Sequence, residues 1–259
     1  MTLTRRIVLT SGKGGVGKTT VTANLGAQLS RMGYRVLVCD TDIGLNNVDV
    51  VMGVEHLIVY DIVDAIEGRC RPKQALVQHT YFKNLYILSS NHSMPDRYIS
   101  PQAVKLIIDA LAPQFDFVLI DCPAGIEDGF HRAVSSAEEA LIVTTPHMSS
   151  LRDADKVISV LQSYRLANIN LVINMARGDM MMNGDILSPR EICDILKIPL
   201  IGMIPEDDSI FLNDISGENN RAFRLLASNI IEGRHKIYDV TKKYSGIFGS
   251  IRRSLKKSL

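Results

Sequence analysis

The sequence predicts an α/β fold: a doubly wound, mostly parallel β-sheet with a P-loop and helices on both faces. Apolar runs of strand length alternate with helix-length segments, several of the runs are continuous in Val, Ile and Leu, and a glycine-rich loop follows the first run. With 259 residues, 46% hydrophobic and 22% charged, the chain can bury one substantial core. We therefore expect one continuous domain for most of the chain.

The expected strands are spaced so that a helix fits between most of them. Seven apolar runs have the composition of buried strands: 7–10, 35–40, 85–89, 115–121, 140–144, 170–174 and 200–204. Helix-length segments, with Gly or Pro near their ends as start and stop signals, occupy 19–31, 101–111, 151–164 and 189–196. Ligands of a doubly wound sheet bind beyond the carboxyl ends of the strands, so functional residues are expected there.

The loop after the first strand has the sequence of a phosphate-binding loop. Residues 12–19 read Gly-Lys-Gly-Gly-Val-Gly-Lys-Thr, the complete pattern G-x-x-x-x-G-K-[ST] between a strand and a helix. Backbone N–H groups would surround phosphate at the helix amino terminus, Lys18 would reach the outer phosphates, and the Thr19 hydroxyl would bind Mg²⁺. A flexible glycine loop without a ligand would leave Lys18 and Thr19 unexplained. The expected binding residues are Gly12, Lys13, Gly14, Gly15, Val16, Gly17, Lys18, Thr19 and Thr20.

Two other strands end in aspartates that would lie beside this loop. The second run ends at Asp40, with Asp42 two residues later, and the fourth run ends at Asp121. Each of these strands therefore brings a carboxylate to the edge of the site where Mg²⁺ and the γ-phosphate would lie. An aspartate at a strand end is also a common helix cap, so either one alone is ambiguous. Together, and beside a P-loop, they favour metal binding and the positioning of water.

A second lysine in the loop carries a resemblance to a known family. Lys13, in Lys-Gly-Gly-Val-Gly-Lys-Thr, resembles the deviant Walker A lysine of the ParA/MinD/nitrogenase-reductase superfamily, which reaches across a dimer to the partner's nucleotide. Blocks along the whole chain are similar to the MinD family of septum-site-determining ATPases, namely 42–45, 49–53, 121–127, 149–155 and 204–207. Asn46 departs from that family, which usually has arginine at this position.

The resemblance implies a role for each matching residue. Lys13 and Lys18 would act on the phosphates, Asp42 would orient the attacking water, and Thr19, Asp42 and Asp121 would serve the Mg²⁺ ion. The implied cofactors are ATP and Mg²⁺, and the implied reaction is a slow, partner-activated hydrolysis of ATP to ADP and phosphate. No guanine-type N-K-x-D sequence occurs, and the adenine side would be formed by Asn174, Pro205, Glu206 and Asp207.

The segment 242–259 differs from the rest of the chain in charge and pattern. It holds six basic residues and no acidic one, which leaves 23 basic against 28 acidic residues, a net charge of −5, for residues 1–241. On a helix its apolar side chains share a sector of about 120° beside four cations. We expect an ATPase domain over 1–241 and a basic hinge with an amphipathic membrane-targeting helix over 242–259. A terminal helix packed on its own domain is the alternative. The expected membrane contacts are Phe248, Ile251, Arg252, Leu255 and Lys256.

The expected location is the cytoplasm and, peripherally, the inner face of the cell membrane. The four cysteines show neither a disulfide pattern nor a zinc pattern, and the amino terminus has no leader-like apolar stretch. No apolar run approaches the roughly 18 to 20 residues that a spanning helix needs, so membrane contact would be peripheral.

Three functions are compatible with the sequence to different degrees. The first is a MinD-like switch that forms a homodimer with ATP and binds anionic lipids. It would recruit a MinC-like division inhibitor and be regulated by a MinE-like factor or a polar anchor. The second is a ParA-like DNA-partition ATPase, although DNA binding does not require the apolar strip of the tail, so no specific nucleic acid is expected. The third, a nitrogenase-reductase-like redox protein, would need two suitably placed cysteines, which Cys122 and Cys193 do not provide.

Overall fold

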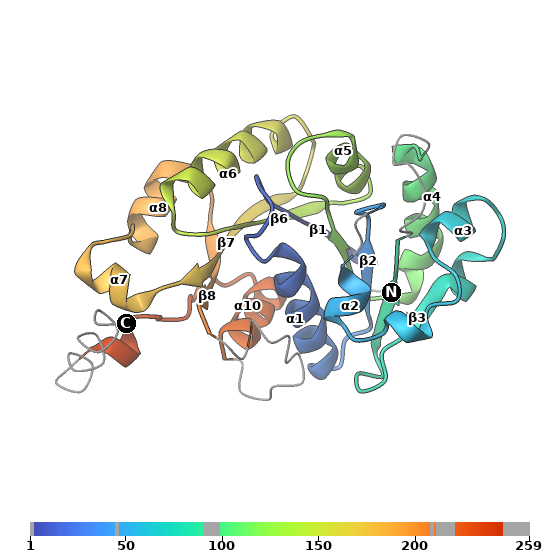
Figure 1. Ribbon diagram of the computed structural model, residues 1–259, viewed down its shortest axis with the longest axis horizontal. Helices are drawn as coiled ribbons and strands as arrows, with labels where there is room; N and C mark the ends of the chain where they lie inside the picture. Colours follow the sequence, from blue (N-terminus) through green and yellow to red (C-terminus); the bar gives the residue numbers. More distant parts are fainter. Residues whose placement is uncertain (1–2, 45–46, 91–98, 208–209, 211–220, 246–259) are drawn as a thin grey trace.

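An eight-stranded β-sheet forms the centre of the molecule (Figure 1). The computed structural model describes residues 3–44, 47–90, 99–207, 210 and 221–245. The strand order is β3-β4-β2-β5-β1-β6-β7-β8, and every neighbouring pair is parallel except β3 with β4. The strands are β1 (Arg5–Thr10), β2 (Val36–Asp40), β3 (Leu76–Gln78), β4 (Leu85–Leu88), β5 (Phe117–Asp121), β6 (Glu139–Thr144), β7 (Asn168–Ala176) and β8 (Leu200–Pro205).

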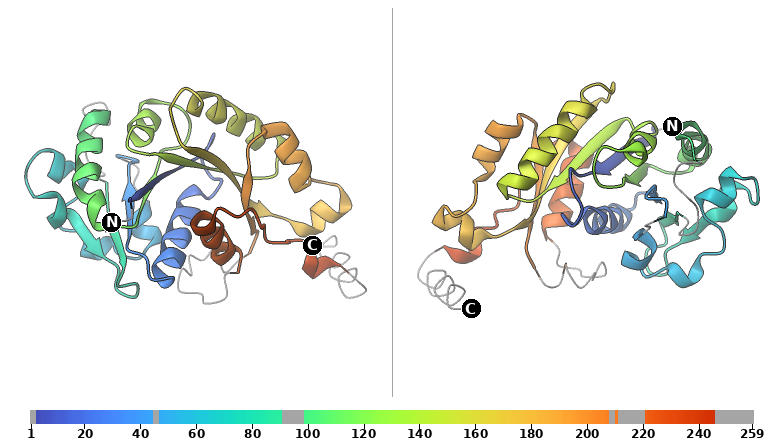
Figure 2. Two further views of the ribbon diagram at one scale, coloured as in Figure 1. Left: turned by 180° about the vertical axis from the view of Figure 1, so that it is seen from behind. Right: turned by 45° about the horizontal axis from the view of Figure 1, so that its top comes forward.

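Helices cover both faces of this sheet (Figures 1 and 2). One face carries α1 (Lys18–Arg31), α2 (Val48–Val51) and α10 (Arg221–Glu232). The other carries α3 (Ile62–Ile66), α4 (Pro101–Leu111), α5 (Asp128–Val134), α6 (Met148–Leu161) and α8 (Pro189–Leu196). The remaining segments are α7 (Gly178–Asn183), η1 (Glu55–Leu57), η2 (Pro72–Ala75), η4 (Ala112–Gln114) and η5 (Lys242–Tyr244).

The two covered faces explain why the strands are apolar without alternation. Ile7 and Leu9 of β1 belong to the core under α1, whereas Val8 between them belongs to the core on the opposite face. Successive side chains of a strand point to opposite faces, so a strand buried on both sides needs an apolar residue at every position. The predicted doubly wound, mostly parallel fold is therefore confirmed.

The structure adds elements that the sequence reading did not include. The edge strand β3 has three residues and pairs antiparallel with β4. Three residues are too few to show the alternation of apolar and polar side chains by which a strand is predicted. Helix α10 packs on β8 and α1 and was also missed, although Phe223, Leu226 and Ile230 recur at helical spacing. Both additions extend the predicted sheet and its helical layers.

The carboxyl-terminal part of the described chain packs on the body of the domain. Val240 and Tyr244 are buried, and η5 packs against α7, so the first residues of the segment predicted as a tail contact the domain. Among the described residues, no helix is both long and apolar enough to cross a membrane. Asn46 lies outside the described residues. The predicted membrane contacts also lie outside them, namely Phe248, Ile251, Arg252, Leu255 and Lys256.

The packing of α10 can be tested with two leucines of opposite exposure. Leu226 on α10 is completely buried, whereas Leu106 on α4 is 68% exposed. Leu226→Ala should lower the free energy of unfolding by about 2 to 5 kcal/mol, because it leaves a cavity between α10 and the sheet. Leu106→Ala should change it by less than about 0.5 kcal/mol. Urea unfolding followed by circular dichroism measures both, and equal losses would contradict this packing.

Candidate nucleotide-binding site

The loop between β1 and α1 is shaped by glycines that no other residue could replace without strain. Gly15 and Gly17 have φ values of 79° and 80°, in the left-handed region that favours glycine. Gly17 is the N-cap of α1, and a Cβ atom added there would lie 2.3 Å from Nδ2 of Asn174. At Gly14, by contrast, an added Cβ would meet nothing within 4 Å. The loop thus turns tightly at the amino terminus of a 14-residue helix, where backbone N–H groups can bind phosphate.

Three side chains of α1 converge on the carboxylate of Asp121 at the end of β5. The Lys18 ammonium lies 2.9 Å from Oδ2, Thr19 Oγ1 donates to the same oxygen at 2.7 Å, and Thr22 Oγ1 donates to Oδ1 at 2.7 Å. The side chains of Lys18 and Asp121 are 9% and 2% exposed. Burial alone would lower the pKa of Lys18, but the charge and hydrogen bond of Asp121 outweigh it, and the pKa is raised. Lys18 and Asp121 therefore form a charged, buried pair directly under the loop.

The oxygens around Asp121 fit a magnesium ion bound together with phosphate. Thr19 Oγ1 and Asp121 Oδ2 are adjacent, and both are the hard oxygen donors that Mg²⁺ prefers. In the part of the chain that the structure describes, no group of three or more His, Cys, Asp or Glu side chains forms a metal cage. Mg²⁺ in nucleotide sites needs no such cage, because phosphate oxygens and water complete its coordination.

Asp40 fastens the loop that carries Asp42. Its carboxylate accepts hydrogen bonds from the backbone N–H groups of Asp42 at 2.8 Å, Asn47 at 3.1 Å and Val48 at 3.2 Å. Asp40 lies opposite Asp121 in the pairing of β2 with β5. Burial, reinforced by the negative charge of Asp121, raises the pKa of Asp40 to about 7. Asp40 is thus a structural anchor for the loop that carries the half-buried Asp42.

The predicted adenine-side residues lie at the ends of β7 and β8. Asn174 is buried, and its Nδ2 donates to the carbonyl of Val16 at 2.8 Å, so it supports the P-loop from behind. Pro205 ends β8, and the exposed Glu206 and Asp207 follow it. The backbone N–H of Glu206 donates to the carbonyl of Ala176 at 3.2 Å, which joins the ends of the two strands.

Lys13 and Gly12 contact the start of α6 within the same chain. Lys13 Nζ donates to Ser149 Oγ at 3.4 Å, and a Cβ atom at Gly12 would lie 2.3 Å from the backbone of Asp153. Ser149 and Arg152 are exposed. The P-loop and the surface formed by residues 149–155 are therefore in direct contact.

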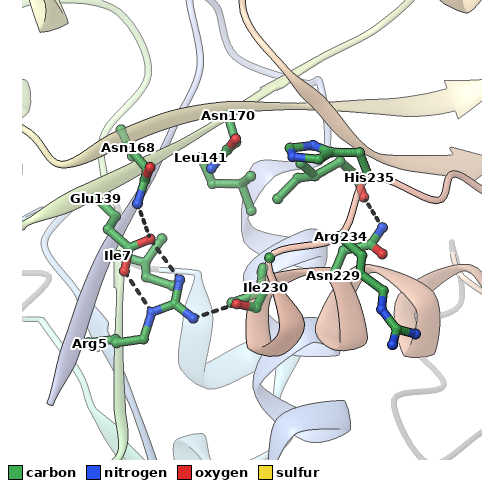
Figure 3. A pocket seen from close by; sticks show the side chains of 13 residues that line it. Arg5, Ile7, Glu139, Leu141, Asn168, Asn170, Asn229, Ile230, Arg234 and His235 are labelled. Atoms are coloured by element: carbon green, nitrogen blue, oxygen red, sulfur yellow. Dashed lines mark hydrogen bonds and ion pairs between the residues drawn. The ribbon is translucent and has the colours of Figure 1, made fainter. Parts of the chain in front are cut away.

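A separate hollow lies at the opposite ends of the strands, where their amino termini are (Figure 3). There Arg5 faces Glu139 in a two-point ion pair with both distances at 2.7 Å, and Arg5 also donates to the carbonyl of Ile230. The side chain of Asn229 donates to the carbonyls of Ile201 and Lys236. These charged and polar groups satisfy one another, so the hollow offers no comparable site for a phosphate or a metal ion.

The sequence reading missed two threonines that complete the site. Thr22 lies one helical turn after Thr19 and donates to Asp121, which the i, i+3 spacing on α1 could have indicated. Thr41 Oγ1 donates to the backbone carbonyl of Asp121 at 2.7 Å and ties the ends of β2 and β5 together. No sequence pattern marks Thr41, because its partner lies on another strand.

Comparison with known proteins agrees with this geometry. The ParA family model, described as NUBPL iron-transfer P-loop NTPase, matches residues 2–218. The septum site-determining protein MinD of Bacillus subtilis is 42% identical over 257 residues, which cover 95% of this chain and 96% of that protein. This chain belongs to the MinD family of P-loop ATPases. Its resemblance to that family, noted from the motifs, is confirmed.

Solved structures of MinD proteins share the fold. MinD in the MinC:MinD cell division complex of Aquifex aeolicus has a TM-score of 0.82 and 38% identity, and the match covers 90% of this chain and 98% of that chain. MinD of Pyrococcus horikoshii OT3, complexed with Mg-ADP, has a TM-score of 0.75 and 33% identity, and the match covers 88% and 96% of the two chains. The P-loop and both aspartate-bearing strand ends fall within the residues matched by the family model.

The cysteines near the site do not resemble ligands for iron. Cys39 and Cys122 are both buried, and burial raises the pKa of the Cys122 thiol to about 12. A cluster shared between two subunits would need cysteines that face the partner, and these two side chains are buried within the domain. The iron-transfer chemistry in the description of the family model therefore has no support from these two residues.

Two glycines of the loop give a matched test of its shape. Gly17→Ala places a Cβ atom against Asn174 at a positive φ, so the free energy of unfolding should fall by at least about 1 to 2 kcal/mol. Gly14→Ala, which has open space, should keep the wild-type melting temperature. Differential scanning calorimetry without nucleotide measures both variants. Equal melting temperatures for the two would contradict the geometry described for Gly17.

Proposed function

We propose that this MinD-family protein is an ATP-driven switch that regulates septum placement from the inner face of the cell membrane. The observation that carries the proposal is the convergence of Lys18, Thr19 and Thr22 on Asp121 beneath a P-loop. The P-loop supplies the phosphate site, and the hydroxyl and carboxylate oxygens supply the Mg²⁺ site. The cofactors are ATP and Mg²⁺, in line with the Mg-ADP complex of the Pyrococcus relative.

Binding of Mg·ATP would exchange the partners of the buried ion pair. The phosphates bring negative charge to Lys18, and Thr19 and Asp121 would hold Mg²⁺ once Lys18 turns to the phosphates. When bound, Mg²⁺ neutralises charge on the phosphate oxygens. Phosphoryl transfer to water then depends on positioning, so Asp42, fastened by Asp40, would orient the attacking water to give ADP and phosphate.

Hydrolysis would be slow in a monomer and faster in an ATP-bound homodimer. Within one chain Lys13 reaches the exposed Ser149. In the dimer we propose that Lys13 leaves this contact and supplies positive charge to the nucleotide of the partner subunit. A charge delivered to the transition state by a second subunit acts like the arginine finger of other P-loop enzymes.

The tail would attach the dimer to anionic lipids. Phe248, Ile251 and Leu255 would insert into the bilayer surface, while Arg252 and Lys256 would contact lipid head groups. One such helix binds weakly, because each cation contributes only about 1 kcal/mol against the cost of ordering the segment. Two tails in a dimer bind far more tightly, since the second insertion is effectively intramolecular. ATP binding would thereby control membrane binding.

Division partners would bind the surface next to the P-loop. A relative forms a MinC:MinD complex, so we propose a MinC-like division inhibitor as a partner, and a MinE-like factor or a polar anchor as the regulator of position. Residues 149–155 are the proposed contact surface. Their direct contact with Gly12 and Lys13 gives a short path from the nucleotide to the partner.

The role of Asp42 predicts a separation of binding from chemistry. Asp42→Ala should lower the single-turnover rate of ATP hydrolysis by about tenfold or more, because water positioning acts in the transition state. The Kd for ATP should stay within about twofold, since Asp42 adds little to the ground state. A large loss of ATP affinity with an unchanged rate would instead assign Asp42 to nucleotide binding.

The coupling of nucleotide to membrane predicts two different failures in sedimentation with anionic vesicles. Lys18→Ala should abolish ATP binding, dimerisation and vesicle binding together, because all three need the phosphate site. Replacing Phe248 and Ile251 by Glu should abolish vesicle binding and leave ATP-dependent dimerisation intact. Neutralising Arg252 and Lys256 instead should weaken vesicle binding, most strongly at low salt and with a high fraction of anionic lipid. The binding that remains should depend less on salt, since the lost attraction is the part that is screened over about 8 to 10 Å at physiological ionic strength.

The same experiment with duplex DNA in place of vesicles separates the partition function from the membrane function. Wild-type protein should sediment with vesicles in the presence of ATP and Mg²⁺ and should not be retained by DNA at physiological salt. ATP-dependent retention by DNA, with no vesicle binding, would replace the proposal by a DNA-partition ATPase.

A further inference from the structure

The last described residues form a strap that packs against α7. This C-terminal strap, residues 237–245, lies at the red end of the chain in Figure 1 and includes η5. Ile237, Tyr238 and Val240 pack against the core, and Tyr244 is 5% exposed. A Cβ atom at Gly178 would lie 2.0 Å from the carbonyl oxygen of Val240, so strap and helix α7 touch backbone to backbone.

Arg177 joins this strap region to the turn after β8. Its guanidinium contacts Asp179 at 2.6 and 3.2 Å and Glu206 at 3.5 Å. Its pKa is raised, first by the hydrogen bond with Asp179 and further by the negative charges of Asp179 and Glu206. Arg177 is the N-cap of α7 and directly follows β7. One side chain thus connects the amino end of α7 to the 205–207 turn, and the next residue, Gly178, is the one that the strap touches.

The same stretch of chain touches the P-loop on its other side. Asn174 donates to the carbonyl of Val16, and the Cε atom of Met175 lies 3.4 Å from the position of a Cβ on Gly17. Met175 has a φ of 53°, and the pairing of β7 with β8 shifts register between Ile173 and Ala176. A non-glycine residue in this conformation is held there by its surroundings, which makes residues 174–177 a short and stiff connection.

We propose that Arg177 is a positioning residue for the nucleotide base and that the C-terminal strap is the support that holds it. This inference rests on the proposed function, in which Asn174 and the 205–207 turn contact adenine. A base seated against the turn stabilises the docked strap, and the docked strap stabilises the base site. Because such coupling is reciprocal, the factor by which the strap raises base affinity equals the factor by which the base favours the docked strap.

The position of the strap gives this coupling a consequence for the tail. Residue 245 directly precedes the segment that carries the predicted membrane contacts. Occupancy of the base site therefore fixes the root of the tail within each subunit, independently of whether two tails act together. Phosphate alone, bound at the P-loop, does not contact the 205–207 turn and leaves the strap unaffected.

The test compares full-length Gly178→Ala with Asn183→Ala, an exposed position at the other end of α7. The added Cβ at residue 178 displaces the strap, whereas Asn183→Ala leaves it in place. By isothermal titration calorimetry, Gly178→Ala should weaken ADP by roughly five- to tenfold, a coupling of ordinary size. The Kd for pyrophosphate should not change, and Asn183→Ala should match wild type for both. Arg177→Lys, which keeps the charge and loses the planar fork, should weaken ADP alone.

Limited proteolysis gives the reciprocal measurement. Trypsin cleavage after Lys242 or Lys243 in the strap should slow in the presence of ADP and not in the presence of pyrophosphate, and Gly178→Ala should remove the difference.

Equal protection by the two ligands, or equal loss of affinity for both, would overturn the inference while leaving nucleotide binding established. Failure of wild type to bind ADP would instead overturn the proposed function. If Gly178→Ala does not fold, Tyr244→Ala removes another buried side chain that holds the strap in place, and unchanged ADP affinity in that variant contradicts the proposal.

Discussion

The buried ion pair between Lys18 and Asp121 is the interaction on which the site depends. Removing one partner of such a pair costs about 3 to 5 kcal/mol, because the remaining charge is left uncompensated in the interior. The pair can open cheaply only if each member receives a new partner at the same time. Mg·ATP offers an anion for Lys18 and a cation for Asp121. In the proposed function this arrangement would therefore favour a metal-bound nucleotide over either component alone.

The sheet supplies the precision that this exchange needs. Asp121 and Asp40 lie opposite each other at the ends of β5 and β2, and β1, on the other side of β5, leads into the P-loop. Burial, with repulsion from the nearby carboxylate of Asp121 added to it, raises the pKa of Asp40 to about 7, while three backbone N–H groups hold its position. The cost of placing both acids together is offset by the charge of Lys18 and by the anchored loop that carries Asp42.

The sequence predicted the parts of this arrangement that are local. The P-loop, the strand ends at Asp40 and Asp121, and both helical layers follow from patterns within a few residues of one another. Contacts between distant segments could not be read in the same way. Nothing near Thr41 shows that its hydroxyl will meet the carbonyl of Asp121, and nothing near Gly178 shows that Val240 will lie against it. Such pairings arise from the strand order, which brings together residues far apart in the chain.

The P-loop is contacted from two directions, and this accounts for how one small ligand can act on two surfaces. On one side Gly12 and Lys13 meet α6, whose exposed residues form the proposed partner surface. On the other side Gly17 and Val16 meet the end of β7, which leads through Arg177 to the strap. Close packing leaves little free volume between the P-loop and α6, so in the proposed scheme the phosphates act on the partner surface through that contact, whereas the base acts on the strap through the 205–207 turn and Arg177. In the proposed function, nucleotide state would thus be linked to partner binding and to the root of the tail by separate contacts.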